Sequence, residues 1–152
     1  MLFRSITHSH GGNVALNLAA VDHTKSSWHI NEAILLACPV QNKTKHLIDN
    51  QLFDRLYSLY STTDTIQVID PQGLYKKETA PDSKGLFSQR IFPYHKKLIQ
   101  AKIRINKHGV PHTNFTFCSF LKHLPALIDH LAEWEKQEPH SKHEILQVHL
   151  RY

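Results

Sequence analysis

The sequence predicts a single α+β domain over residues 1–152, in which an antiparallel sheet packs against two main helices. Apolar residues recur at helical spacing in two stretches, at about 49–61 and 121–136, and these predict the helices. The other apolar runs are short, and the clearest of them, Lys97–Asn106, alternates as a half-buried strand does. Segregated strands and helices favour an α+β fold with an antiparallel sheet. The order of elements is compatible with two successive strands-then-helix units.

The first third of the chain is expected to contain strands. Val14, Leu16 and Leu18 alternate with small or polar residues, directly after a turn signal at Gly11-Gly12. Ser27–Cys38 is predicted to be a strand, with a short buried helix as the alternative that periodicity leaves open.

The first helix is expected to begin at Asp49, a plausible N-cap residue. Its apolar face would be formed by Leu52, Phe53, Leu56, Leu59 and Tyr60. Beyond it, Thr65–Ile69 and Leu74–Glu78 are predicted to pair through a turn at Asp70–Gly73. A polar loop follows at Thr79–Gly85.

The second half is predicted to be a series of strands around the second helix. The predicted strands are Leu86–Tyr94, Lys97–Asn106, Asn114–Ser119 and Glu144–Leu150, with a hairpin loop at Lys107–His112. On Lys97–Asn106, one face is expected to be apolar and the other polar. The apolar face consists of Ile99, Ala101, Ile103 and Ile105.

No secretory signal and no membrane-spanning run are recognisable, so we expect a cytoplasmic protein without a membrane partner. Cys38 and Cys118 both lie in apolar runs. We expect both to be buried free thiols, because unpaired cysteine behaves as a small hydrophobic residue.

Positive charge is concentrated in the second half of the chain. Residues 1–76 hold six basic and six acidic side chains, whereas residues 77–152 hold twelve basic and seven acidic ones. Ser83–Ile128 contains no Asp or Glu at all. A basic surface of this kind attracts phosphates or acidic partners, although a solvated face without a partner is the simpler alternative.

Several motifs with strong chemical meaning are absent from the sequence. There is no glycine-rich phosphate loop, no Cys-x-x-Cys, no His-Glu-x-x-His and no Gly-x-Ser-x-Gly. The thirteen histidines include the pairs His8 with His10, His108 with His112, and His140 with His143. Zinc sites need three or four ligands, so we expect neither a native metal nor a cofactor.

The constellation that the sequence supports best is a mixture of cations and aromatic rings on predicted strands. Lysine and arginine follow phosphates, and exposed rings stack on bases, so the mixture predicts binding of single-stranded nucleic acid without catalysis. The candidate residues are Arg90, Phe92, Tyr94, Lys96, Lys97, Lys102, Arg104 and Lys107.

The segment from Lys97 to Lys136 resembles the single-stranded nucleic-acid-binding proteins of the PC4/PUR/Whirly type. The likeness rests on the basic amphipathic strand Lys97–Ile105, the returning run Phe115–Cys118 and the amphipathic helix Leu121–Lys136. The resemblance implies a curved antiparallel sheet backed by helices, often in a homodimer.

Two other functions remain open at the level of the sequence. The basic face could bind an acidic protein partner, which would make the chain an interaction module or accessory subunit. A small metal-independent ribonuclease could instead use His95, His108 and His112 as proton carriers, with Lys102 and Arg104 stabilising phosphorane charge.

Overall fold

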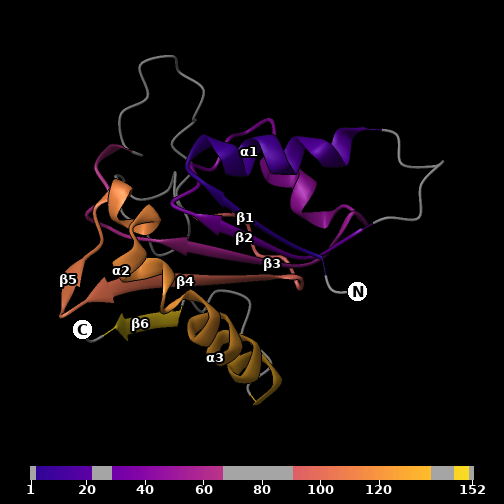
Figure 1. Ribbon diagram of the computed structural model, residues 1–152. Helices are drawn as coiled ribbons and strands as arrows, with labels where there is room; N and C mark the ends of the chain where they lie inside the picture. The colour runs from indigo at the N-terminus through magenta and orange to yellow at the C-terminus, as the bar shows by residue number, and fades with distance from the viewer. Residues whose placement is uncertain (1–2, 22–28, 67–90, 138–145, 151–152) are drawn as a thin grey trace.

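The computed structural model describes residues 3–21, 29–66, 91–137 and 146–150. The described residues form one sheet with helices on both of its faces (Figure 1). Five parallel strands lie side by side in chain order: β1 (Arg4–His8), β2 (Ile30–Leu36), β3 (Phe53–Tyr60), β4 (Leu98–Ile105) and β6 (Leu146–Leu150). The two-residue strand β5 (His108–Gly109) turns back antiparallel on the end of β4.

The predicted antiparallel α+β sheet is therefore wrong, and so is the arrangement in two strands-then-helix units. Strand β2 shows why, because it is buried on both faces. Ala33 and Leu35 belong to one core cluster, while Ile34 and Leu36 belong to the other. Strands buried on both sides are typical of parallel sheets that carry helices on both faces.

The predicted helix at about 49–61 is also wrong, because most of this stretch forms strand β3. The short 3₁₀ helix η2 (Lys45–Asp49) ends at Asp49, so this residue does not begin a helix. Leu56 through Tyr60 are all buried. A strand that buries every residue contains apolar pairs at every spacing, including three and four, so helical periodicity alone is misleading here.

The predicted strand around Val14–Leu18 is replaced by helix α1 (His10–Asn17) and the 3₁₀ helix η1 (Leu18–Ala20). Leu16 is fully buried against the sheet, whereas Val14 and Leu18 are exposed. Helix α1 and strand β1 form the first strand–helix connection of the parallel sheet.

Other elements are confirmed. Strands β2, β4 and β6 lie within the predicted stretches. Helix α3 (Leu124–Gln137) corresponds to the helix predicted at 121–136 but begins later. The chain does turn back after β4, but it returns as β5 within the stretch Lys107–His112 that was predicted to be the hairpin loop. The returning strand predicted at Asn114–Ser119 does not exist, because the 3₁₀ helix η5 (His112–Thr116) and helix α2 (Cys118–Leu121) occupy that stretch.

Two core clusters cover the two faces of the sheet. Leu16 of α1, Ile48 of η2 and Phe92 pack on one face. Leu127 and Leu131 of α3 pack on the other face. Figure 1 shows α1 and α3 on opposite sides of the sheet.

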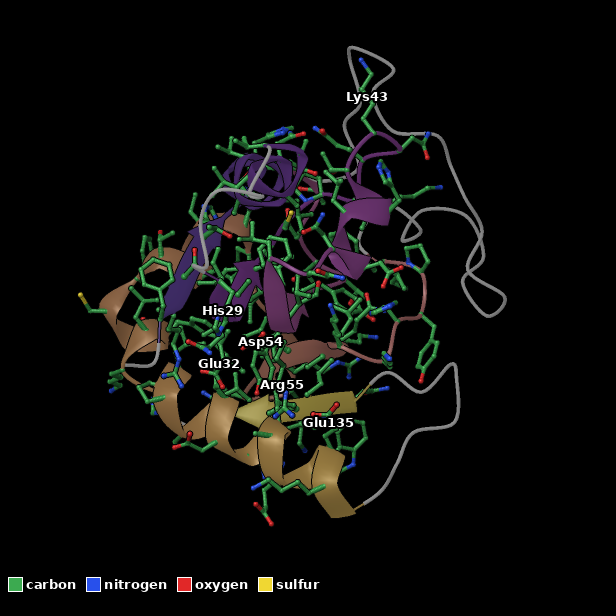
Figure 2. All side chains as sticks on the ribbon, turned by 90° about the vertical axis from the view of Figure 1, so that its right-hand side faces the viewer. His29, Glu32, Lys43, Asp54, Arg55 and Glu135 are labelled. Carbon is green, nitrogen blue, oxygen red and sulfur yellow. The ribbon has the colours of Figure 1, made fainter. Side chains whose placement is uncertain are left out.

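Ion pairs join the amino ends of the strands to α3, on the side shown in Figure 2. Arg4 Nη2 lies 2.5 Å from Glu32 Oε2, and Arg55 Nη2 lies 3.3 Å from Glu135 Oε2. Glu32 and Arg55 are register partners on β2 and β3. This network connects β1, β2, β3 and α3 near the amino ends of the strands.

Several predictions lie outside the described residues. The predicted strand Leu74–Glu78, the turn at Asp70–Gly73, the loop at Thr79–Gly85, and the greater part of the predicted strands Thr65–Ile69 and Leu86–Tyr94 fall there. The described start of the first of these two strands, residues 65–66, contains no strand. Ile91–Tyr94, which is described, contains no strand. Cys38 is buried as predicted, but Cys118 is exposed, and both are free thiols. In the described part of the chain, no helix is both long and apolar enough to cross a membrane.

Candidate active site

The loops that follow the parallel strands meet at the carboxyl edge of the sheet, where the arrows point in Figure 1. Ligands bind at this edge in open parallel sheets. Three side chains of the types used in acyl transfer follow three different strands. Ser9 directly follows β1, Asp64 follows β3, and His112 follows β5.

Ser9 occupies a sharp turn between β1 and α1. Its backbone has φ 55° and ψ −134°, a conformation that costs a non-glycine residue about 1–3 kcal/mol. The turn is held on both sides, because the Ser9 N–H donates to the Leu36 carbonyl at 2.9 Å and the Gly12 N–H donates to the Ser9 carbonyl at 3.0 Å. Ser9 is therefore fixed in a strained strand-to-helix turn.

Helix α1 has two glycines in its first turn, Gly11 and Gly12, close to the residues that it packs against. A Cβ atom added to Gly11 would lie 3.9 Å from Thr7 Cβ, an ordinary van der Waals contact, so this side of the turn has room for one. A Cβ atom on Gly12 would lie 2.8 Å from Cys38 Cβ and would overlap the Cys38 Sγ atom. Helix α1 is thus seated closely on the end of β2.

Asp64 and His112 form a buried pair. His112 Nδ1 lies 2.6 Å from Asp64 Oδ2, and the two side chains are 9% and 0% exposed. A carboxylate accepts the proton of Nδ1–H and so fixes the tautomer and the orientation of the imidazole. The nitrogen left to take up a proton is then Nε2.

Ser61 connects the turn that carries Asp64 to the segment that leads to His112. Its Oγ accepts from the Val110 N–H at 2.7 Å and from the Thr63 N–H at 3.3 Å. Gly109 packs directly on Thr63, because a Cβ atom on Gly109 would overlap the Thr63 side chain. The acid and the base are therefore held by adjoining backbone segments.

His112 contacts His8, the last residue of β1. The two imidazole rings have centroids 4.6 Å apart, and His8 Nε2 lies 2.9 Å from the His112 carbonyl oxygen. Since His8 immediately precedes Ser9, the ring of His112 contacts the residue that adjoins the serine in the chain. A serine, a histidine and a buried carboxylate are thus assembled at one edge of the sheet.

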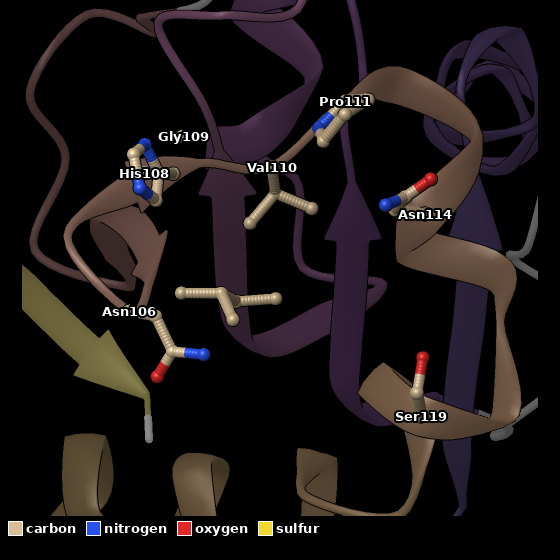
Figure 3. Close-up of a pocket in the computed structure, with 8 residues that line it drawn as sticks. Asn106, His108, Gly109, Val110, Pro111, Asn114 and Ser119 are labelled. Carbon is tan, nitrogen blue, oxygen red and sulfur yellow. The ribbon is translucent and has the colours of Figure 1, made fainter. Parts of the chain in front are cut away.

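The segment that leads to His112 forms part of the lining of a pocket. It is lined by Ile105, Asn106, His108, Gly109, Val110, Pro111, Asn114 and Ser119 (Figure 3). Its lining includes none of the three residues assembled above. We therefore treat it as separate from the Ser9 turn.

The structure places the predicted nucleic-acid-binding residues in different environments. Phe92 is 2% exposed and therefore has no free face for stacking, while Arg90 lies outside the described residues. Lys97 Nζ donates to the backbone carbonyl of Asn50 at 3.1 Å. Tyr94, Lys96 and Lys107 are exposed.

Lys102 and Arg104 lie on the same face of β4, opposite to Ile99, Ala101 and Ile103. Partial burial lowers the pKa of Lys102, and the nearby charge of Arg104 lowers it further. Two cations thus come together, but nucleic-acid binding by the wider set stays a prediction.

The histidines assigned to a ribonuclease do not share one site. His95 lies just before β4 and pairs with Asp49 at 2.8 Å, whereas His112 lies beyond the other end of β4. Within the ranges that the structure describes, no three His, Cys, Asp or Glu side chains are grouped to hold a metal ion. The pair His140 and His143 lies outside those ranges.

Ser9 and Asp64 were not among the site residues predicted from the sequence, and His112 was predicted in a different role. The available signal was Thr7-His8-Ser9-His10-Gly11, which has the spacing of Gly-x-Ser-x-Gly with threonine in place of the first glycine. Comparison of the chain with protein-family models, with curated proteins and with solved structures returned no match.

Proposed function

We propose that this protein is a serine hydrolase that cleaves carboxylic esters, with Ser9 as nucleophile, His112 as general base and Asp64 as the group that orients His112. The observation that carries the proposal is the buried Asp64–His112 pair beside the strained Ser9 turn. Serine is a weak nucleophile by itself, and an adjacent base that is oriented by a third group activates it.

The order of the three residues along the chain also supports the proposal. In the α/β-hydrolases the serine occupies a strained strand-to-helix turn, and the residues follow in the order serine, acid, histidine. Here the order is Ser9, Asp64, His112; Ser9 and Asp64 follow the parallel strands β1 and β3, and His112 follows β5, the short strand that turns back antiparallel on the end of β4. Threonine at position 7 departs from the common glycine, yet it does not crowd Gly11, since even a Cβ atom added to Gly11 would lie 3.9 Å from Thr7 Cβ.

The proposed reaction has two balanced steps. Ser9 Oγ attacks the ester carbonyl carbon, and its proton passes to His112 Nε2. The C–O bond to the alcohol breaks, and the alcohol leaves with the proton from His112. Water then attacks the acyl-serine ester with the same histidine as base, which releases the carboxylic acid and restores Ser9.

The negative charge on the tetrahedral intermediate requires hydrogen-bond donors. The backbone N–H after the nucleophile supplies one donor in a turn of this kind, and here it belongs to His10, the first residue of α1. The positive end of the helix dipole adds to this stabilisation.

Reaction with a fluorophosphonate probe and hydrolysis of p-nitrophenyl acetate test the proposal. We expect the wild-type protein to form a covalent adduct that mass spectrometry maps to Ser9, and to hydrolyse the ester. Ser9→Ala should lose both reactions, while Ser119→Ala, which changes an exposed serine, should keep them. An unmodified wild-type protein with no ester hydrolysis would overturn the proposal, as would an adduct elsewhere.

Polyanion binding is a second candidate function, favoured by the shared face of Lys102 and Arg104 on β4. Fluorescence anisotropy with a short labelled single strand tests it. Affinity should fall as salt rises and should weaken in the double variant Lys102→Ala, Arg104→Ala. An unchanged affinity in that variant would show that these two residues are not the binding surface.

A further inference from the structure

His8 is a histidine of the site for which the triad itself provides no role. It is the last residue of β1 and immediately precedes Ser9. Its ring is half-buried and lies against the ring of His112, at an interplanar angle of 51°. A side chain that contacts the general base and adjoins the nucleophile is well placed to influence the distance between them.

The hydrogen bond of His8 has a defined direction. His8 Nε2 lies 2.9 Å from the carbonyl oxygen of His112, and a carbonyl oxygen only accepts. Nε2 of His8 therefore carries the proton and donates it. The bond joins residues 104 positions apart in the chain.

The topology explains why such a connection matters. Ser9 follows β1 at one side of the sheet, whereas His112 follows β5, which pairs with β4, and strands β2 and β3 lie between β1 and β4. The segment that carries His112 must reach across the ends of two strands. Asp64 fixes the imidazole at Nδ1, and His8 fixes the backbone of the same residue on the side of Ser9.

We propose that His8 is a positioning residue that, by donating a hydrogen bond to the His112 carbonyl, holds the general base in line with Ser9 and thereby sets the rate of the chemical step. This inference rests on the proposed hydrolase function. A group that aligns reacting atoms without touching the substrate affects kcat more than KM, and misplacement by about 1 Å can cost about 10²-fold in rate.

Two substitutions separate the hydrogen bond from the ring contact. His8→Phe keeps an aromatic ring but removes the donor, whereas His8→Gln removes the ring but keeps an amide N–H that can donate. The matched control is His130→Phe, which changes an exposed histidine on α3. Circular dichroism and thermal melting establish that each variant is folded, and His8→Leu replaces His8→Phe if the latter does not fold.

Each variant is assayed for kcat and KM with p-nitrophenyl acetate and for the rate of fluorophosphonate labelling. We expect His8→Phe to lower kcat and the labelling rate by about 10- to 10²-fold with KM changed less than about twofold. His8→Gln should recover most of the loss, and His130→Phe should match the wild type.

The outcomes distinguish the two proposals. A wild-type protein that is inert toward both reagents overturns the hydrolase function itself. An active wild type with undiminished kcat in folded His8→Phe overturns the positioning role alone. Equal losses in His8→Phe and His8→Gln, or a rise in KM without a fall in kcat, overturn it as well.

Discussion

At the scale of single residues, the tautomer of His112 decides whether the site can act as a base. The Asp64 carboxylate accepts from Nδ1 at 2.6 Å, which leaves Nε2 to accept a proton. Asp64→Asn keeps the shape, but its amide can donate to Nδ1 and so favours the tautomer with hydrogen on Nε2. We expect kcat for ester hydrolysis to fall by about 10⁴-fold.

Steady-state kinetics together with a thermal melt check this prediction. The control is Asp54→Asn, because Asp54 is half-exposed and lies 3.3 Å from His29 at the opposite end of the sheet. The control should keep the wild-type kcat. A folded Asp64→Asn variant whose kcat is within tenfold of the wild type would contradict the role of Asp64.

The two cysteines should differ sharply in reactivity. Burial raises the pKa of Cys38 to about 12, although a hydrogen bond with Asn13 works in the opposite direction. The thiolate is the reactive form, and Cys118 is exposed. We expect iodoacetamide at pH about 8 to modify Cys118 and to reach Cys38 only after denaturation, as mass spectrometry would show.

The same shift has a consequence for stability. From the ordinary value of 9.0 up to about 12, the Cys38 thiol ionises in the unfolded chain but not in the folded one. The folded state is therefore favoured less as pH rises through this range. Modification of both cysteines at equal rates in the native protein would contradict the burial of Cys38.

The proposed nucleophile lies in the sequence Thr7-His8-Ser9-His10-Gly11, which departs from Gly-x-Ser-x-Gly only at the first glycine. The threonine does not crowd the turn, because even a Cβ atom added to Gly11 would lie 3.9 Å from Thr7 Cβ. The pairing of His112 with Asp64 was out of reach, because these residues are 48 positions apart and only the folded sheet brings them together.

At the scale of elements, the contact between α1 and the end of β2 depends on Gly12. A side-chain Cβ there would overlap Cys38 Sγ. We expect Gly12→Ala to reduce the free energy of unfolding by about 1–3 kcal/mol, because extra atoms in a packed contact force the backbone apart. Denaturant unfolding measures the effect.

Gly11→Ala provides the matched control within the same helix turn. An added Cβ there meets Thr7 Cβ at 3.9 Å, an ordinary contact. Alanine also favours helix over glycine by about 1 kcal/mol, so this variant should be as stable as the wild type or more so. Equal destabilisation by both substitutions would show that crowding at Cys38 is not the cause.

Element types were predictable where one face of a strand is polar. Strand β4 alternates Ile99, Ala101 and Ile103 with polar residues, and its position was correct. Strand β3 is buried almost throughout, so its apolar residues fit a helix equally well and only its neighbours in the sheet determine its type. Helix α1 was predicted to be a strand because Val14, Leu16 and Leu18 alternate with small or polar residues, as in a half-buried strand.

At the scale of the whole molecule, the site exists because parallel strands end at a common edge. Ser9 and Asp64 follow the parallel strands β1 and β3, and His112 reaches the same edge after β5, which turns back on the end of the parallel strand β4. The sequence predicted short strands and a late helix but not their relative direction. The relative direction of the strands depends on which faces of the sheet the connecting helices cover. Here α1 and α3 cover opposite faces of the sheet.

Among the residues that the structure describes, no strand pairs with the side of β1 that faces away from β2, and this edge predicts self-association. The Glu32 N–H donates to the Phe3 carbonyl and the Ser9 N–H to the Leu36 carbonyl. In a parallel ladder this pattern turns the backbone groups of Arg4, Ile6 and His8 toward the open side. Exposed apolar edges are templates for pairing with another chain.

Ile6 is 53% exposed on this edge. We expect the protein to form a dimer in which two copies of β1 pair antiparallel, and light scattering after size exclusion should show a mass that rises with concentration. Ile6→Lys should shift the protein toward monomer, because a charged edge residue opposes pairing.

The control is Ile66→Lys, which changes an isoleucine that is 54% exposed and lies outside β1, and it should leave the dimer intact. A wild-type protein that is monomeric at all concentrations, or equal effects of both substitutions, would exclude pairing through β1.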